Sequence, residues 1–93
     1  MRTIETTTRF RRDYKREKKG QLGKHLDALL REVIDLLAED NPLPARYADH
    51  PLAGDWKDHR DCHVRPDLIL IYRQVGFDTL QLVRLGSHSE LGF

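Results

Sequence analysis

Five consecutive apolar residues, Leu68 to Tyr72, constrain the fold of this chain more than any other feature of its sequence. A strand with one face in water alternates apolar and polar residues, and this run does not alternate. It therefore predicts a central strand over residues 67–75. Residues 75–78, which include Gly76, have the composition of a tight hairpin turn, so residues 79–85 are expected to return as the neighbouring strand.

Two helices are expected in the N-terminal half. Apolar residues, most of them leucines, recur at helical spacing over residues 22–39 and form a wide stripe that we interpret as core. This helix must stop before Pro42, since proline lacks a backbone donor and disfavours helix in the residue before it. A shorter helix is expected over residues 8–19, capped by a threonine and ended by Gly20.

Two further strands complete the pattern. One is expected over residues 2–6, and the other over residues 56–64, where Trp56, Cys62 and Val64 have the spacing of one strand face. The order β-α-α-β-β-β predicts an α+β fold, in which a small antiparallel β-sheet carries the two N-terminal helices on one face.

Composition excludes several classes of protein. The chain has 93 residues, 39% of them hydrophobic, so we expect a single domain over residues 1–93 and no larger enzyme fold. No apolar run reaches the roughly 18–20 residues of a membrane span, and residues 1–5 lack the apolar region of a signal peptide. The single cysteine, Cys62, fits a reducing compartment. We therefore expect a cytoplasmic protein that contacts no membrane.

A metal site is not expected. One cysteine is too few for the usual structural zinc sites, which need two to four thiolates. His59 and His63 have the i,i+4 spacing that suits zinc on a helix, but on a strand they stand ~13 Å apart. We therefore expect neither a metal ion nor another cofactor.

Charge is unevenly distributed along the chain. The net charge is only +1, yet residues 1–26 carry nine basic and three acidic side chains. Six of the cations gather on one face of the expected first helix: Arg11, Arg12, Lys15, Arg16, Lys18 and Lys19. Because a solvated helix face usually mixes both signs of charge, this pattern favours binding of phosphates over an ordinary exposed face, which stays the alternative.

The C-terminal residues suggest acid/base chemistry. Cleavage of RNA without a metal needs a base for the 2′-hydroxyl, an acid for the leaving oxygen and a cation for the phosphorane. Histidine suits either proton role, and arginine suits the third. Arg84 and His88 lie four residues apart around Gly86, and Ser87 and Glu90 have the spacing of a capping box. We expect His88 in the first turn of a short terminal helix.

Four stretches resemble YafQ-type toxins of the RelE/ParE superfamily of bacterial toxin–antitoxin modules. They are residues 49–57 (DHPLAGDWK), 60–64 (RDCHV), 66–72 (PDLILIY) and 84–91 (RLGSHSEL). The resemblance covers nearly the whole chain, and it implies a small endoribonuclease, an mRNA interferase, that cuts messenger RNA in the ribosomal decoding site without a metal.

The resemblance also assigns residues to that activity. His50, His63, Asp67 and His88 match the acid/base cluster of the family, and Arg84 matches its phosphate-contacting arginine. We expect His88 to be one proton-transfer group and either Asp67 or His50 to be its partner. Arg84 is expected to stabilise the transition state, while His63 positions the substrate or shares the proton transfer.

One position departs from the family pattern. The family has an aromatic residue directly after the leucine that follows the histidine, where it is thought to pack on the substrate base. Here the order is Leu91-Gly92-Phe93, so the ring is displaced by one residue. Phe93 is the candidate for stacking on the substrate.

The same resemblance implies partners. They are the 70S ribosome, the messenger RNA and a cognate antitoxin of ribbon-helix-helix type, similar to DinJ or RelB. The toxin would contact operator DNA only through this antitoxin. The six cations of the first helix are then expected to dock on ribosomal RNA phosphates. Two alternatives stay open: a ParE-like gyrase poison, and a non-catalytic module that binds RNA or a partner.

Overall fold

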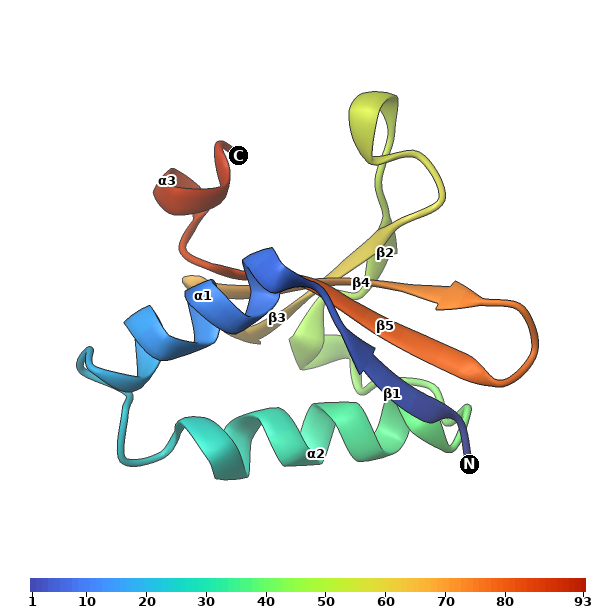
Figure 1. The fold of residues 1–93 in the computed structure, drawn as a ribbon, viewed down its shortest axis with the longest axis horizontal. Coiled ribbons are helices and arrows are strands. Elements are labelled where there is room, and N and C mark those ends of the chain that lie inside the picture. The colour runs from blue at the N-terminus through green and yellow to red at the C-terminus, as the bar shows by residue number, and fades with distance from the viewer.

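The apolar run over residues 68–72 lies at the centre of a five-stranded sheet, as its composition predicts. In the computed structural model, which describes residues 1–93, β4 (Leu68–Val75) lies between β3 (Arg60–Arg65) and β5 (Thr79–Gly86) and pairs antiparallel with both (Figure 1). All five residues of the run are at most 2% exposed, because both faces of the sheet are covered.

The two edge strands are short. β2 (His50–Pro51) pairs antiparallel with β3, and β1 (Thr3–Thr6) pairs parallel with β5, which gives the order β1-β5-β4-β3-β2. The predicted α+β fold is thus confirmed, with an antiparallel arrangement from β2 to β5 and a mixed sheet overall. β1 is free to pair in parallel because no hairpin joins it to β5. β2 falls in a predicted loop, since two residues carry no periodic signal.

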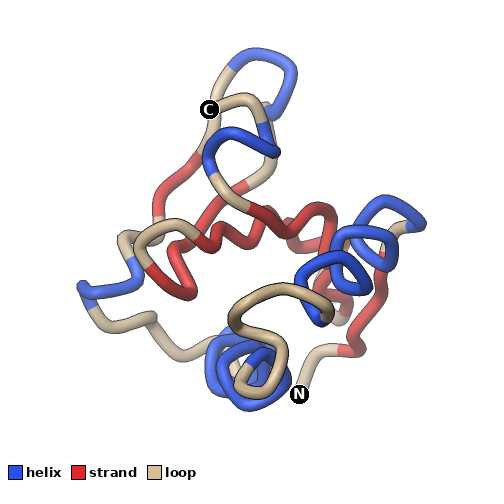
Figure 2. The backbone as a smooth tube through the Cα atoms, turned by 90° about the vertical axis from the view of Figure 1, so that its left-hand side faces the viewer, coloured by secondary structure: helices blue, strands red, loops and turns tan.

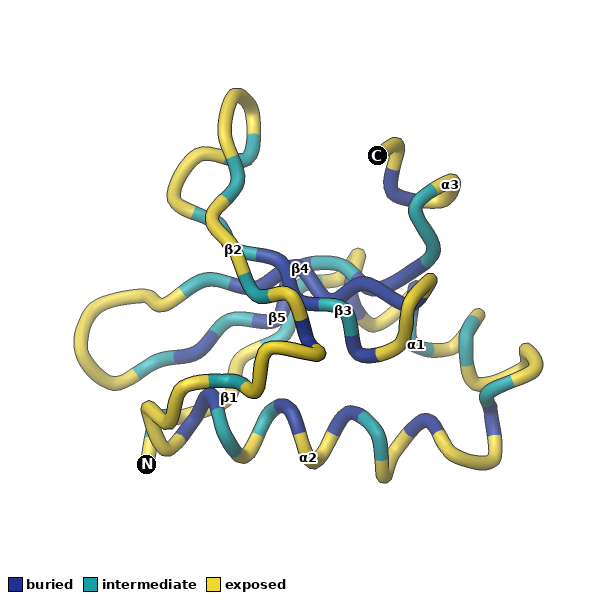
Figure 3. The backbone as a smooth tube through the Cα atoms, turned by 180° about the vertical axis from the view of Figure 1, so that it is seen from behind, coloured by how far each residue is buried: buried dark blue, intermediate teal, exposed yellow.

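Two helices pack against the sheet, the first along the edge of β5 beyond β1 and the second across one face. They are α1 (Thr8–Lys18), whose N-cap Thr7 accepts a hydrogen bond from the backbone of Phe10, and α2 (Leu26–Ala38). Phe10 joins the apolar stripe of α2 and the inward side chains of β3, β4 and β5 in the main core. Figure 2 shows α2 end-on beneath the sheet, and Figure 3 shows its buried positions turned toward the strands.

The second helix begins four residues later than predicted. Residues 20–25 form a turn, in which a Cβ atom at Gly23 would lie 2.1 Å from the carbonyl oxygen of Lys18. This close approach requires glycine, and it holds the chain out of the helix until Leu26. Leu22 still packs against the core.

The opposite face carries a smaller apolar cluster. Ile69, Ile71 and Val83 of the sheet pack there with Leu91, against partly buried Leu52 and Trp56. These last three come from α3 (His88–Leu91) and from the arm that contains β2 and the 3₁₀ turn η2 (Gly54–Trp56); Figure 1 shows α3 and the arm rising from the same face.

The prediction of a strand over residues 56–64 is wrong at its start. β3 begins at Arg60, and Asp58 has a positive φ of 70°, which interrupts an extended chain before that point. Trp56 therefore packs in the smaller cluster, whereas Cys62 and Val64 belong to the main core. The other 3₁₀ turn, η1 (Ala45–Tyr47), contacts β3.

No helix of the structure is long and apolar enough to cross a bilayer.

Candidate active site

Three imidazoles meet on the sheet face opposite α2. They belong to His50 of β2, His63 of β3 and His88 at the start of α3. The ring centroids of His50 and His63 are 6.4 Å apart, and those of His63 and His88 are 5.3 Å apart. His63 therefore lies between the other two, and segments distant in sequence converge as the sequence predicts.

Sheet register explains this convergence. His63 is opposite Ile69, which is opposite Gly86, and His88 follows two residues later. In the neighbouring row Asp61 is opposite Ile71, and Ile71 is opposite Arg84. Partners across a sheet share one face, so both rows present their side chains on the side of the smaller cluster.

Asp67 fixes the orientation of His88. It lies in the turn before β4, and its Oδ1 accepts hydrogen bonds from the backbone N–H of His88 at 3.0 Å and from the ring Nδ1 at 2.7 Å. A carboxylate only accepts, so the hydrogen is on Nδ1 and Nε2 is left for proton transfer. The backbone and ring hydrogen bonds from His88 lower the pKa of Asp67. Asp67 is thus an ionised acceptor near neutral pH.

Ser87 and Glu90 form the predicted capping box. The Ser87 hydroxyl accepts from the backbone of Glu90, and Glu90 accepts from the backbone of Ser87. This box starts α3 at His88, and Gly92, with a φ of 79°, ends it. The backbone N–H of Phe93 donates to the carbonyl of His88 at 2.9 Å, which keeps the half-exposed Phe93 beside the end of α3.

Asp61 is a buried carboxylate of the site that the sequence interpretation missed. Its Oδ1 lies 3.1 Å from Nδ1 of His50, but that N–H is directed at the carbonyl of Ala48 at 2.8 Å, which leaves the carboxylate oxygen without its own donor. Burial raises the pKa of Asp61. A signal existed, because Asp61 precedes His63 by two residues on the same strand and so shares its face.

Arg84 lies on the same sheet face but is held from α1. Its Nε donates to Oδ2 of Asp13 at 2.7 Å, and its Nη2 donates to Oδ1 at 3.3 Å. Asp13 is buried and also accepts from the backbone of Leu85 and from Arg16. Burial alone would raise the pKa of Asp13, but the hydrogen bonds and positive charges around it outweigh burial and lower that pKa.

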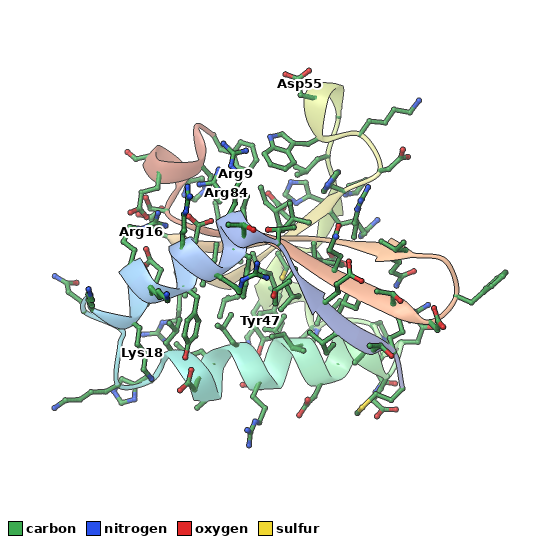
Figure 4. The ribbon with its side chains drawn as sticks, viewed as in Figure 1. Arg9, Arg16, Lys18, Tyr47, Asp55 and Arg84 are labelled. Carbon is green, nitrogen blue, oxygen red and sulfur yellow. The ribbon has the colours of Figure 1, made fainter.

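The six cations of the first helix fall into two groups. Arg16 and Lys18 form ion pairs within the protein, Arg16 with Asp13, Glu17 and Glu90, and Lys18 with Asp27. The other four are exposed and form no ion pair: Arg11, Arg12, Lys15 and Lys19. Arg11 hydrogen-bonds to threonines at the start of the helix. An exposed cation outside the predicted set, Arg9, belongs to the same helix; Figure 4 labels it with Arg16 and Arg84.

No group of three or more histidine, cysteine, aspartate and glutamate side chains is placed to hold a metal ion. His59, which the sequence pairs with His63 at i,i+4, instead stacks edge-on against Trp56.

Comparisons with known proteins identify the family of the chain. The sequence profile described as "Bacterial toxin of type II toxin-antitoxin system, YafQ" matches residues 2–92. The mRNA interferase toxin YafQ of Escherichia coli K12 is 41% identical over 92 residues, which cover 97% of this chain and 95% of that protein. The putative toxin YafQ of Haemophilus influenzae is 52% identical over 61 residues, covering 62% of this chain and 60% of that protein.

Solved structures show the same fold. The E. coli DinJ–YafQ complex aligns with a TM-score of 0.78 at 37% identity and covers 98% of both chains. A metal-bound toxin from Helicobacter pylori aligns with a TM-score of 0.82 at 47% identity and covers 98% of this chain and 99% of that one. The chain belongs to the YafQ family of bacterial toxins of type II toxin–antitoxin systems.

Proposed function

We propose that this toxin is an endoribonuclease that cuts messenger RNA in the decoding site of the ribosome by acid/base chemistry, without a metal ion. The observation that carries the proposal is the convergence of His50, His63 and His88 on one sheet face. The E. coli relative is named an mRNA interferase, which supports RNA as the substrate.

Proton transfer is assigned to the two outer imidazoles. In an in-line displacement the attacking and leaving oxygens lie on opposite sides of the phosphorus, so the base and the acid must flank it. His50 and His88 lie on either side of His63, and each has Nδ1 committed to an oxygen, which leaves Nε2 for the reaction. Of the two expected partners of His88, this geometry favours His50 over Asp67, whose Oδ1 is already bound to His88.

Arg84 is assigned to the negative charge that develops on the phosphate. Asp13 occupies the Nε–Nη2 edge of its guanidinium, so the Nη1 side remains for a phosphate oxygen. The Arg84 side chain is 15% exposed, which gives a ligand access. His63 lies between the two proton-transfer groups and is assigned to substrate positioning, and Phe93 to stacking on a base.

Docking on the ribosome is assigned to the exposed cations of α1. Arg11, Arg12, Lys15 and Lys19 can reach ribosomal RNA phosphates without breaking an ion pair. Arg16 and Lys18 would first have to leave internal partners. We therefore assign docking to the four exposed members of the set.

The E. coli relative is described in complex with DinJ, and we infer a cognate antitoxin of ribbon-helix-helix type for this chain as well. Operator DNA is then contacted only through that antitoxin. A toxin that acts on ribosomes is expected in the cytoplasm.

Primer extension on programmed 70S ribosomes tests the proposal. Wild-type protein should cut the message at the decoding site, and the His88→Ala variant should cut about 10²–10⁴-fold more slowly. A parallel arm contains 1,10-phenanthroline, which removes transition metals but spares the Mg²⁺ that ribosomes need, and cutting should persist there. Inhibition of DNA supercoiling without cleavage of RNA would identify a gyrase poison. If the protein shows neither activity, the alternative of a non-catalytic binding module is favoured.

A further inference from the structure

A polar network joins α1, β5 and α3 beside the imidazoles, and the proposed proton transfer does not use it. We propose that Asp13 and Arg16 are positioning residues: Asp13 presents the guanidinium of Arg84 to the phosphate, and Arg16 holds α3 so that His88 faces the substrate. This inference rests on the proposed function, and its test separates the two.

Asp13 grips Arg84 from one side only. Its two oxygens engage Nε at 2.7 Å and Nη2 at 3.3 Å, so the plane of the guanidinium is set and its Nη1 edge is turned away from the carboxylate. Oδ2 also accepts the backbone N–H of Leu85 at 3.0 Å, and Oδ1 accepts Nη1 of Arg16 at 3.0 Å. Asp13 is 3% exposed and accepts hydrogen bonds from four donors, so its carboxylate has little freedom to rotate. The orientation of the Arg84 guanidinium is therefore fixed as well.

Arg16 extends the grip to α3. Its Nη2 donates to the carbonyl of Leu85 at 2.8 Å. Its Nε donates to Oε2 of Glu17 at 3.0 Å and also forms an ion pair with Oε2 of Glu90 at 2.8 Å. The other oxygen of Glu90 accepts the backbone N–H of Ser87 at 2.9 Å in the capping box. One guanidinium thus ties the last residues of β5 to the helix that begins at His88.

Gly86 makes this arrangement possible. A Cβ atom at that position would lie 2.7 Å from Nη2 of Arg16 and 3.2 Å from Oε1 of Glu90. The guanidinium therefore lies directly over the backbone between Arg84 and His88, a place that only glycine leaves open. Gly86 has no positive φ, so this contact, and not a turn conformation, explains the glycine at the end of β5.

The network also distinguishes Arg16 from its neighbours on α1. An arginine that docks on RNA needs guanidinium nitrogens that are free to bind phosphate. In Arg16 all three nitrogens already contact protein groups. Arg12 lies on the same helix, is exposed and forms no hydrogen bond or ion pair, so a variant at Arg12 tests docking and not positioning.

Single-turnover cleavage on programmed ribosomes, titrated to saturation, tests the proposal. Asp13→Asn and Arg16→Gln should lower the maximal rate by about 10- to 100-fold, the loss expected when reacting groups shift by about 1 Å, with half-saturation within about twofold of wild type. Arg12→Gln should do the reverse, raising half-saturation with little change in maximal rate. Glu90→Gln keeps a capping side chain but removes the charge facing Arg16, so its maximal rate should also fall.

A double-mutant cycle separates positioning from general stability. In an Arg84→Ala background, Asp13→Asn should cost clearly less rate than it does in the wild type, because the part of its effect that passes through Arg84 is already lost. A purely structural role would lower the rate again by the same factor. The Nε–H signal of Arg84 in ¹⁵N NMR reports the grip without any RNA: it should be protected from exchange in the wild type and exchange faster in Asp13→Asn.

The outcomes are distinct. Wild-type maximal rates in Asp13→Asn and Arg16→Gln, a faster rate in Asp13→Asn, or additive losses in the cycle would each overturn the inference. If Asp13→Asn does not fold, Arg16→Gln and Glu90→Gln still decide the part that concerns α3, and NMR of the wild type decides the part that concerns Arg84. If the wild type does not cut RNA on ribosomes, the proposed function fails instead.

Discussion

Replacing Asp67 by alanine is expected to slow RNA cleavage about 10- to 30-fold, far less than replacing His88. Asp67 holds the imidazole through Nδ1 and through the backbone N–H, and its side chain is 69% exposed, so its loss should leave the fold intact. The effect should therefore come from the lost orientation of one ring.

The size of this rate loss follows from the conformational freedom that the His88 ring regains. Without the carboxylate, His88 samples about three χ1 wells and two χ2 orientations, which dilutes the productive rotamer roughly sixfold. The hydrogen is no longer held on Nδ1, and the competing tautomer costs a further factor of a few. An amide oxygen in Asp67→Asn can still accept both hydrogen bonds, so this variant should lose only about threefold.

The assay is single-turnover cleavage on programmed ribosomes with wild type, Asp67→Asn, Asp67→Ala and His88→Ala. If Asp67 itself transferred a proton, both of its variants would lose about 10²–10⁴-fold, as His88→Ala should. Equal, large losses in Asp67→Asn and His88→Ala would refute the orienting role and return Asp67 to the acid/base pair.

Three further predictions concern stability and reactivity. The hydrogen bonds and positive charges that lower the pKa of Asp13 stabilise the folded protein above pH 3.8, the ordinary pKa of the group, and this stabilisation is lost as the pH falls below that value. In urea unfolding, Asp13→Asn should therefore be about 3 kcal/mol less stable than the wild type at pH 7, and this difference in stability should shrink below pH 3.8. Gly86→Ala should lower the free energy of unfolding by about 1–3 kcal/mol and slow cleavage, because Arg16 must move; an unchanged Tm would contradict this. Burial raises the pKa of the Cys62 thiol, so a thiol reagent should modify it only at the rate of unfolding.

Much of the fold follows from local pattern. The unbroken apolar run identifies β4 as central, and the leucine stripe identifies α2, because burial on two faces or on one stripe leaves a periodic trace. Elements without such a trace are misplaced or missed. β2 has two residues, and α2 starts late because of a contact between Gly23 and Lys18 that no periodicity encodes.

The residues of the site also fall into those that the sequence predicts and those that only the structure reveals. The chemistry and spacing of the C-terminal residues indicate Arg84 and His88, whereas a family resemblance is needed to predict His50, His63 and Asp67. The sheet register explains why the histidines and Arg84 share a face. Asp13 could not be identified from α1 alone, since an acidic residue among the cations of a helix is typical of local charge compensation. Its partner Arg84 is 71 residues away, and only the tertiary structure brings the two together.

The chemical ends of the cut RNA test the central claim most directly. Proton transfer by imidazoles to and from the RNA itself makes the 2′-hydroxyl the nucleophile, which leaves a 2′,3′-cyclic phosphate on one fragment and a 5′-hydroxyl on the other. We predict these ends from wild-type toxin on programmed ribosomes, in the same yield with 1,10-phenanthroline. Fragments with 3′-hydroxyl and 5′-phosphate ends, which mark attack by water, would contradict it.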